Sequence, residues 1–385
     1  MKILKLAIKN AGRHKLRTGL TIVGLAVAVM AFGLLRTVIS AWYAGAEASA
    51  PDRLVTRNAV NIIFPLPLSY KEQILKVPGV EKVSYAHWFG AYYIDPKQFF
   101  ANFAVDHHTY FDLFPEVIVD SQTLANFRSQ RNAAVVGQIL ADRFGWKPGD
   151  QIRLIGTIYP GNWDLVIAGI YHGRDKTTDE SSFMLRWDYL DETLRATVPV
   201  RAGYVGWYIS EISSPVEAVR ISAAIDSMFK NSLAETLTQT EKQFQLSFIA
   251  MSGTIITALR VISYLIIGIL LLVLTNTMAM SARERISEYA VMKTLGFKPF
   301  HLVQLIAGES LFISLSGGIL GILLTFPMAT GFGEAMKYFF PVFEINPRDL
   351  FVAGIFALSV GILASMFPIL KATRVSIVDG LRSVA

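Results

Sequence analysis

The chain contains no cysteine among its 385 residues, and charged residues make up only 17% of it. Without cysteine the protein cannot hold a disulfide framework, a thiolate metal site or a cysteine nucleophile. Hydrophobic residues make up 52% of the chain, which is more than a soluble protein of this length usually carries. Membrane spans must therefore be sought before any other feature.

Motifs for nucleotide binding and hydrolysis are also missing from the sequence. No GxxxxGK[ST] segment is present, so we expect no phosphate-cradling loop for ATP, and neither HExxH nor GxSxG occurs. His107 and His108 stand beside Asp106, but adjacent side chains do not converge on one site in regular structure. We expect no catalytic residue, no cofactor site and no metal site in this chain.

Four stretches are almost free of charge and are close to the about 20 residues that cross a bilayer core. The predicted spans are residues 18–43, residues 251–282 including the end of a stalk, residues 299–333 and residues 350–370. The first is longer than the apolar part of a signal peptide and contains Arg36, so we treat it as an uncleaved anchor.

Basic residues predict the orientation of these spans. Residues 1–17 contain six basic and no acidic residues, and residues 283–298 and 371–385 are also net basic. These segments are predicted to be cytoplasmic, with residues 44–250 and the short loop 334–349 outside. Together the three predicted cytoplasmic segments carry more positive charge than the net +6 of the whole chain, so the basicity indicates topology and not nucleic-acid binding.

Residues 1–17 also have the pattern of an amphipathic helix. Lys2, Lys5, Lys9 and Arg13 follow one helical stripe, and small or apolar residues take the opposite side. We expect this helix to lie in the inner interface of the lipid bilayer, with its cations near anionic headgroups.

Residues 44–250 are long enough to form an α+β domain with its own core. A helix at 69–76 with a strand at 80–88, and a strand at 203–212 with a helix after Pro215, are predicted to pair. The part between them, about 106–200, is then an inserted second subdomain. Residues 231–260 are predicted to be helical and to lead into the second span.

Polar and small residues inside the spans point to helix packing more than to a transport pathway. Arg36 either snorkels to the outer surface or pairs with another helix. The amide of Asn276 is expected to bond across helices, and Glu309 needs a partner or a proton. Gly317 and Gly321 have the GxxxG spacing that permits close approach of two helices.

The charged segment 281–299 separates the second and third spans. It is either a solvated loop or a short helix on which another protein acts, and its composition favours the helix. Ile286, Tyr289 and Met292 recur on one side, which would face the membrane or a partner's cleft, and Gly296 and Pro299 end the helix. Its charged residues are predicted polar contacts: Arg283, Arg285, Glu288 and Lys293.

These segments resemble a known family. HKLRTGLTIVG at 14–24, RERISEYAVMKTLG at 283–296 and the tail from Pro368 through Arg374 to Arg382 are similar to the MacB/FtsX-type permeases of ABC transporters. In the second segment Arg283, Glu288, Lys293 and Gly296 occupy the places that the family pattern expects. The family includes lipoprotein-releasing permeases and macrolide-exporter-like permeases.

The resemblance implies a bacterial inner-membrane protein that dimerises with a second copy or a paralogue. Each permease would dock one separate ATPase, which binds ATP and Mg, on a coupling helix at 283–298, and ATP-driven motion would reach the periplasmic domain. The work done would be export, with an adaptor or outer-membrane duct as a further partner, or extraction of a substrate. Two alternatives stay open: an FtsX-like scaffold that regulates a cell-wall hydrolase or periplasmic adaptor, and an ATP-independent channel.

Overall fold

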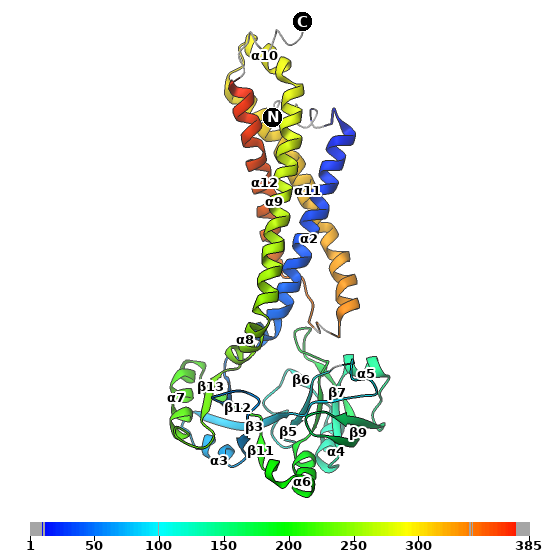
Figure 1. Ribbon diagram of the computed structural model, residues 1–385, viewed down its shortest axis with the longest axis vertical. Helices are drawn as coiled ribbons and strands as arrows, with labels where there is room; N and C mark the ends of the chain where they lie inside the picture. The colour runs from blue at the N-terminus through cyan, green and yellow to red at the C-terminus, as the bar shows by residue number, and fades with distance from the viewer. Residues whose placement is uncertain (1–9, 11, 99, 339, 341, 375–385) are drawn as a thin grey trace. The chain divides into compact units, whose positions relative to one another are not determined.

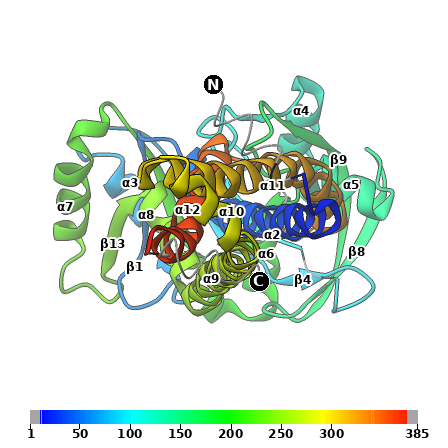
Figure 2. The same cartoon turned by 90° about the horizontal axis from the view of Figure 1, so that it is seen from above.

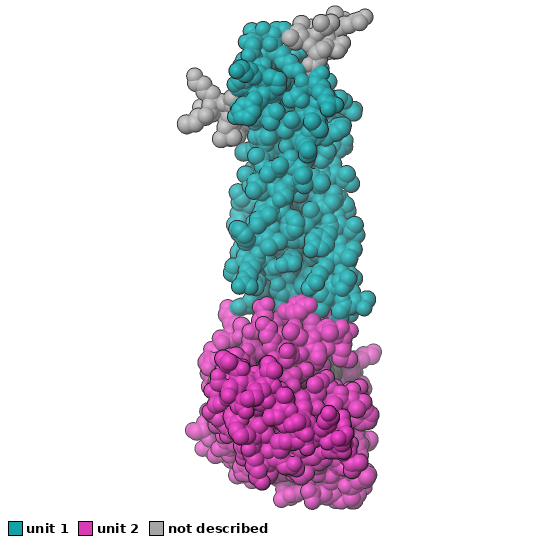
Figure 3. Space-filling model, turned by 90° about the vertical axis from the view of Figure 1, so that its left-hand side faces the viewer, with its two compact units in different colours: residues 1–41, 252–335, 343–385 teal, residues 42–251, 336–342 magenta. Residues whose placement is uncertain are grey.

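The computed structural model describes residues 10, 12–98, 100–338, 340 and 342–374 (Figure 1). The chain divides into two compact units, which Figure 3 colours separately. The first comprises residues 1–41, 252–335 and 343–385, and the second comprises residues 42–251 and 336–342. Most of the predicted amphipathic helix at 1–17 lies outside the described residues, and the described part forms a turn before the first long helix.

Four helices are long and apolar enough to cross a membrane, as the sequence predicted. They are α2 (Lys15–Ala48), α9 (Gly253–Glu284), α11 (Pro299–Met336) and α12 (Pro347–Arg374). Seen from above, α9 lies at the rim of this bundle (Figure 2). The helices α2, α11 and α12 begin before or end after the predicted spans, since a helix continues into water wherever its sequence still favours it.

Small residues allow α11 to lie close to its neighbours. A Cβ added to Gly317 would lie 2.6 Å from the Cβ of Leu25, and one added to Gly321 would lie 2.6 Å from the carbonyl oxygen of Ala26. Both contacts are with α2. On α11's other neighbour, the Ser310 hydroxyl donates to the Gly361 carbonyl of α12 at 2.7 Å. The GxxxG pair therefore faces α2, where a larger side chain would separate the two helices.

The second unit is built on an eleven-stranded mixed sheet. Its strand order is β13-β1-β12-β3-β5-β10-β7-β9-β8-β4, with β6 paired to β9, and β2 and β11 form a separate two-stranded sheet. The strands are β1 (Arg53–Asn58), β2 (Leu66–Pro67), β3 (Val80–Trp88), β4 (Ala91–Tyr92), β5 (Asn102–Val105), β6 (Val117–Ile118), β7 (Ala133–Gly137), β8 (Gln151–Gly156), β9 (Gly161–Gly173), β10 (Phe183–Arg186), β11 (Tyr204–Val205), β12 (Trp207–Ile212) and β13 (Thr236–Thr240).

Both faces of the large sheet are covered by apolar side chains. Along β7, Ala134 and Val136 enter one buried cluster, and Ala133 and Val135 enter the other. This is the alternation expected of a strand buried on both sides. The first cluster also takes in residues from α3 (Tyr70–Ile74), α5 (Gln138–Phe144), α6 (Trp187–Thr197) and α7 (Ala218–Met228), and the second from α4 (Ser121–Ser129).

The predicted inserted subdomain does not separate from the rest of the domain. The strand β3 pairs antiparallel with β12, as the two predicted strand–helix pieces require. However, β5 pairs with β3 on one side and with β10 on the other, so the strands of the insertion continue the same sheet. One apolar cluster also includes Leu54 and Tyr208 together with Val136 and Leu154. The two parts therefore share one hydrogen-bonded β-sheet and one hydrophobic core.

The predicted helix at 231–260 is wrong in its first part. Residues 236–240 form β13, which pairs with β1, and helix follows only from α8 (Glu241–Met251). The outer edge of β13 is covered, because the Thr238 amide donates to Asp226 at 3.0 Å and the Thr240 amide to Gln243 at 3.3 Å. Ser252 separates α8 from α9.

Candidate functional site

The candidate site is the short helix α10 (Ile286–Thr294), which follows α9 after Arg285. Gly296 ends it with a left-handed backbone, φ +85°, a conformation that glycine adopts without steric cost. The Gly296 amide donates to the Lys293 carbonyl at 3.1 Å, and the Phe297 amide to the Met292 carbonyl at 3.0 Å. These bonds satisfy carbonyls at the helix end, so the chain turns there toward α11.

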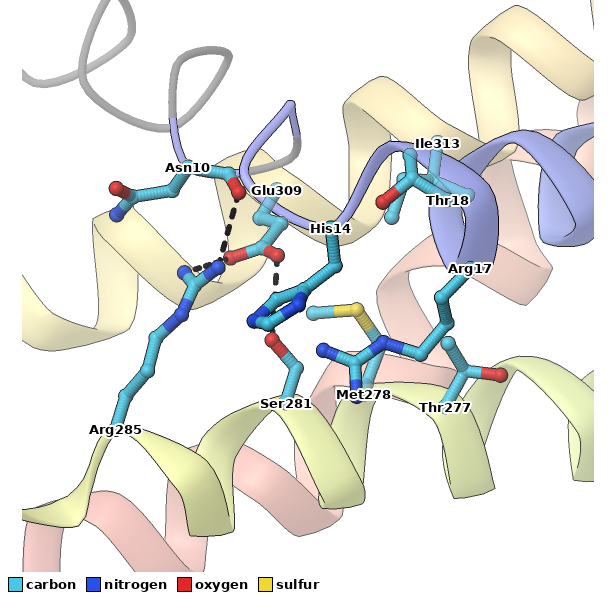
Figure 4. Close-up of a pocket in the computed structure, with 10 residues that line it drawn as sticks. All are labelled: Asn10, His14, Arg17, Thr18, Thr277, Met278, Ser281, Arg285, Glu309 and Ile313. Atoms are coloured by element: carbon cyan, nitrogen blue, oxygen red, sulfur yellow. Dashed lines mark hydrogen bonds and ion pairs between the residues drawn. The ribbon is translucent and has the colours of Figure 1, made fainter.

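Arg285 is buried and not available to a partner. Its side chain is only 4% exposed and forms an ion pair with Glu309 of α11 at 2.9 Å. A second guanidinium nitrogen donates to the carbonyl of Asn10 at 2.9 Å, and Ser281 donates to the other Glu309 oxygen at 3.4 Å (Figure 4). The prediction of Arg285 as an ATPase contact conflicts with this burial. Arg285 instead supplies the partner that Glu309 needs.

A small pocket beside this ion pair has a volume of about 10 Å³, which is about the space of one water molecule. His14, just before α2, and Arg17, in the first turn of α2, line it (Figure 4). Arg17 pairs with Glu284 at 2.8 Å, and His14 lies 3.6 Å from the same carboxylate. The pocket is too small for a substrate, and its charged groups already pair with one another.

The predicted apolar side of α10 faces the chain's own helices. Tyr289 is 2% exposed and belongs to a cluster with Leu302 and Ile306 of α11, and Met292 packs against that cluster. Burial raises the pKa of the Tyr289 phenol to about 12, so it is neutral at physiological pH. Ile286 is half-buried. This side therefore meets neither of the two surfaces considered from the sequence, membrane or partner cleft.

Two charged residues of α10 tie it to other segments. Lys293 donates to the Thr373 carbonyl of α12 at 2.9 Å. Glu288 pairs with Arg13 at 2.6 Å, and both of these side chains are partly exposed. Arg283 lies in the last turn of α9 and not in α10, and it is exposed. Of the predicted polar contacts, Arg283 and Glu288 are therefore the more accessible to a partner.

An exposed apolar surface at the end of α10 was missed from the sequence. Val291 is 45% exposed, Leu295 71% and Phe297 43%, with exposed Thr294 among them. We call these four residues the tip surface. The spacing of Val291 and Leu295, four residues apart, places them on one side of the helix and could have revealed it.

The other predicted membrane residues take several positions. Arg36 pairs with Asp349 of α12 at 2.8 Å, and Ser40 also donates to that carboxylate, so the interhelical alternative holds and not snorkelling. Asn276 lies on the exposed side of α9, and within the described residues its amide has no hydrogen-bond partner. Arg374 ends α12 and is exposed, and Arg382 lies outside the described residues.

The Asp106–His108 segment is engaged with other groups of the domain. Burial opposes ionisation of Asp106, but hydrogen bonds from Lys71 and Thr109, each 2.7 Å, outweigh it and hold the pKa of this carboxyl below its ordinary value. His107 lies 3.7 Å from Asp188. In the part of the chain that the structure describes, no group of three or more His, Asp or Glu side chains could hold a metal ion.

Sequence comparisons identify both parts of the chain. A family model described as the MacB-like periplasmic core domain matches residues 18–227, and one described as the FtsX-like permease C-terminal region matches residues 260–377. The uncharacterized ABC transporter permease MJ1507 of Methanocaldococcus jannaschii is 23% identical over 412 residues, covering 99% of this chain and 97% of that protein. The uncharacterized ABC transporter permease YvrN of Bacillus subtilis is 32% identical over 108 residues, 28% of this chain and 25% of that protein.

Solved structures of related domains give weaker matches. The periplasmic region of MacB from Actinobacillus actinomycetemcomitans is 11% identical with a TM-score of 0.36, over 51% of this chain and 92% of that one. The extracellular domain of YknZ from Gram-positive bacteria is 11% identical with a TM-score of 0.35, over 49% of this chain and 100% of that one. The two family models cover the membrane helices and the domain between the first and second, and the resemblance seen in the sequence is confirmed. The chain therefore belongs to the MacB/FtsX-type permeases of ABC transporters.

Proposed function

We propose that a separate ABC ATPase docks on the tip surface and that the permease transmits the movement of that ATPase to its periplasmic domain. The ATPase would bind the ATP and Mg, and two permease chains would form the complex. One observation carries the proposal: α10 is fixed to the rest of its unit along one side and exposes apolar residues at its end. Leu295 is 71% exposed, whereas Tyr289, six residues earlier, is 2% exposed.

The attachments of α10 reach several segments of the bundle. Arg285 joins it to Glu309 of α11 and to Asn10, and Lys293 joins it to α12. A force on the tip surface would therefore move several helices together and would not simply bend α10. This is the behaviour needed of a coupling element, because packed helices transmit displacement with little compression.

Chain connectivity offers the route from the bundle to the domain. The helix α2 continues without interruption to Ala48, whose residue number falls in the second unit, and only Ser252 separates α8 from α9. The basic flanks support a cytoplasmic position for both termini and for α10, and hence an inner-membrane location. The work done on the periplasmic side would be export or extraction of a substrate, with an adaptor or outer-membrane duct as a further partner.

The test is co-purification of the full chain with the ABC ATPase encoded beside it, followed by ATP hydrolysis in lipid nanodiscs. Leu295→Glu and Val291→Glu place charge in the apolar tip surface, so we expect each to reduce ATPase recovery at least about tenfold, the effect of burying an unpaired charge. Leu16→Glu is the matched control, since Leu16 is 79% exposed but lies at the start of α2. Undiminished ATPase binding and hydrolysis in Leu295→Glu would overturn the proposal.

An FtsX-like scaffold that regulates a cell-wall hydrolase or adaptor is the second candidate, favoured by the match of residues 260–377 to the FtsX-like model. It would use the same tip surface, so the ATPase test does not separate the two. Crosslinking from the periplasmic domain does, because recovery of a hydrolase supports the scaffold, and recovery of an export adaptor supports transport.

A further inference from the structure

Residues 336–342 join the ends of two membrane helices but group with the domain. Helix α11 ends at Met336 and α12 begins at Pro347. The residues on either side of this segment belong to the helical unit, whereas residues 336–342 belong to the second unit with residues 42–251. Such a grouping requires contacts between these residues and the domain. We call residues 336–342 the strap; the structure describes five of them, Met336, Lys337, Tyr338, Phe340 and Val342.

Tyr338 is the residue of the strap that meets the far side of the domain. The guanidinium carbon of Arg143, near the end of α5, lies over the Tyr338 ring, 4.8 Å from its centroid. The Lys337 ammonium lies 5.6 Å from the same centroid. A cation within about 6 Å of an aromatic ring is attracted by the negative charge on the ring face. The Tyr338 side chain is therefore held to α5 by a cation–π contact.

Arg143 is itself fixed to the core of the domain. Its guanidinium carbon also lies 5.0 Å from the centroid of the Phe144 ring. Phe144 stacks on Trp146 with centroids 4.7 Å apart, and Trp146 is 5% exposed and belongs to a buried apolar cluster of the domain. The contact with Tyr338 therefore leads through neighbouring aromatic rings to the domain core.

A second contact of the strap lies on α2. The Phe340 ring meets the Trp42 ring edge to face, with centroids 5.1 Å apart and an angle of 71°. Trp42 belongs to α2 and is the first residue of the second unit. The Phe340 amide donates to the Met336 carbonyl at 2.9 Å, which continues the turn of α11 into the strap. The strap therefore binds the domain at two places that are far apart in sequence.

The other two connections of the domain meet at one place. The chain enters the domain at the end of α2 and leaves it through α8. The Ala50 amide donates at 3.1 Å to the carboxylate of Glu241, the first residue of α8, and Arg53 donates to the same carboxylate at 2.8 Å. Both connections therefore lie beside β1, and by themselves they give the domain a single pivot.

The contact with α5 lies at a different part of the sheet. Helix α5 directly follows β7, and β7 is reached from β1 by five steps in the order β1-β12-β3-β5-β10-β7. Neighbouring strands are about 4.8 Å apart, so β1 and β7 are about 24 Å apart along the sheet. An attachment at that distance from the pivot opposes a rotation that the pivot alone would permit.

Tyrosine and lysine between membrane helices can also serve as anchors at the bilayer surface. An anchor of that kind contacts lipid headgroups and needs nothing from the domain. Here Arg143 and Trp42, both residues of the second unit, contact the rings of Tyr338 and Phe340. These two contacts favour attachment to the domain over anchoring in lipid.

We propose that the strap, through the contact of Tyr338 with Arg143, ties α5 of the domain to the ends of α11 and α12 and restrains the domain from rotating on its α2 and α8 connections. Its use rests on the proposed function. Because α10 packs on α11 through Tyr289 and Leu302, the strap gives a movement received at α10 a second route to the domain.

Paired cysteines test the attachment without background, because the natural chain has none. The full chain in lipid nanodiscs, without its ATPase, is treated with a short bis-maleimide, and crosslinked peptides are identified by mass spectrometry from the monomer band. Asp142→Cys on α5 should crosslink with Met336→Cys at several times the yield of Ser129→Cys with Met336→Cys. Asp142 and Ser129 are both exposed, but α4, which ends at Ser129, covers the other face of the sheet. Equal yields would overturn the attachment.

The aromatic ring is tested in the Asp142→Cys/Met336→Cys background. We expect Tyr338→Leu to lower the crosslinked fraction at least about threefold, and Tyr338→Phe to keep most of it, because phenylalanine retains the ring that attracts the cation. Arg143→Met should act like Tyr338→Leu. An undiminished yield in Tyr338→Leu would mean that this side chain is a lipid anchor only, and would overturn the proposal.

The restraint is measured as the mobility of the domain. A fluorophore on Ser129→Cys in the same nanodiscs reports rotation of the domain as a loss of residual anisotropy. This anisotropy should fall in Tyr338→Leu and stay at the wild-type value in Tyr338→Phe; an equal value in all three chains would overturn the restraint. No arm contains the ATPase, and Tyr338 lies outside the tip surface. Failure here therefore leaves the effect of Leu295→Glu on ATPase recovery untouched, and the two proposals fail separately.

Discussion

Each of the two units contains a buried arginine that joins three chain segments. In the helical unit Arg285 binds Glu309 of α11 and the Asn10 carbonyl, and in the domain Arg53 of β1 binds Glu241 of α8 at 2.8 Å and Glu116 at 2.5 Å. Both side chains are 4% exposed. Arg53 also donates to the Leu113 carbonyl at 2.7 Å and lies 4.3 Å above the ring of Phe114.

The difference between the two sites is their balance of charge. Arg285 faces one carboxylate, whereas Arg53 faces two. Burial, with Glu116 nearby, raises the pKa of Glu241 despite the attraction of Arg53. The interior of a membrane unit has no water to solvate an excess charge, so the positive and negative charges of its ion pair must be equal. The domain tolerates a surplus carboxylate, because that carboxylate can take up a proton. The first site is therefore a balanced ion pair, and the second holds one carboxylate more than its arginine can neutralise.

The largest effect should come from breaking the balanced pair. Arg285→Met leaves Glu309 buried without its cation, and we expect a loss of about 3–5 kcal/mol in stability. Thermal unfolding of the full chain in detergent measures it. Arg283→Met is the control, because Arg283 is exposed two residues earlier and its removal should leave the midpoint unchanged.

The double variant Arg285→Met/Glu309→Met sharpens the same comparison. Methionine fills a similar volume without charge, so the pair should recover most of the stability lost in the single variant. A single variant as stable as the wild type, or a double variant no better than the single, would show that the pair does not hold α10 to the bundle.

Breaking the domain site should have a smaller effect, about 3 kcal/mol, because Glu241 can take up a proton once Arg53 is gone. The variant is Arg53→Met, with Arg57→Met, half-buried on the same strand, as the control. Tryptophan fluorescence reports on this unit alone, because all six tryptophans have residue numbers between 42 and 207. An equal loss of stability in Arg53→Met and Arg57→Met would show that Arg53 has no special role.

The smallest effect should be the pH dependence of the domain. The pKa of Glu241 is raised in the folded state, so its protonated carboxyl stabilises the fold at pH values below the unfolded-state pKa, about 4.3. This stabilisation is lost as the pH rises through the folded-state pKa. On going from pH 7 to pH 5, the fluorescence midpoint of the wild type should therefore rise relative to that of Glu241→Gln. The depressed pKa of Asp106 acts only below about pH 4. Parallel curves between pH 5 and pH 7 would contradict the assignment.

Local pattern predicted much of the fold, and non-local pairing accounts for what it missed. The strand at 80–88 follows from its alternating side chains and is β3 in the structure. By contrast, β13 was assigned to a helix because its five residues lead into α8, and its strand conformation depends on pairing with β1, almost 180 residues away. An edge strand of this kind has little signal of its own.

At the candidate site, periodicity predicted which residues share a side of α10 but not what that side faces. Ile286, Tyr289 and Met292 do follow one side, yet it packs on α11, which comes later in the chain. The partner of Arg285 could not be derived either, since several acidic residues are available in sequence and only the packing of α9 against α11 selects Glu309. Helix periodicity determines which side chains point the same way. Tertiary contacts determine what that side of the helix packs against.

The covered edge of β13 affects how the domain interacts with other polypeptide chains. A sheet whose last strand shows free amides is a template for strand addition by any extended peptide nearby. Asp226 and Gln243 occupy two of these amides with side chains of the same domain. Extended segments of other chains therefore find these two amides already bonded and are hindered from adding a strand at this edge.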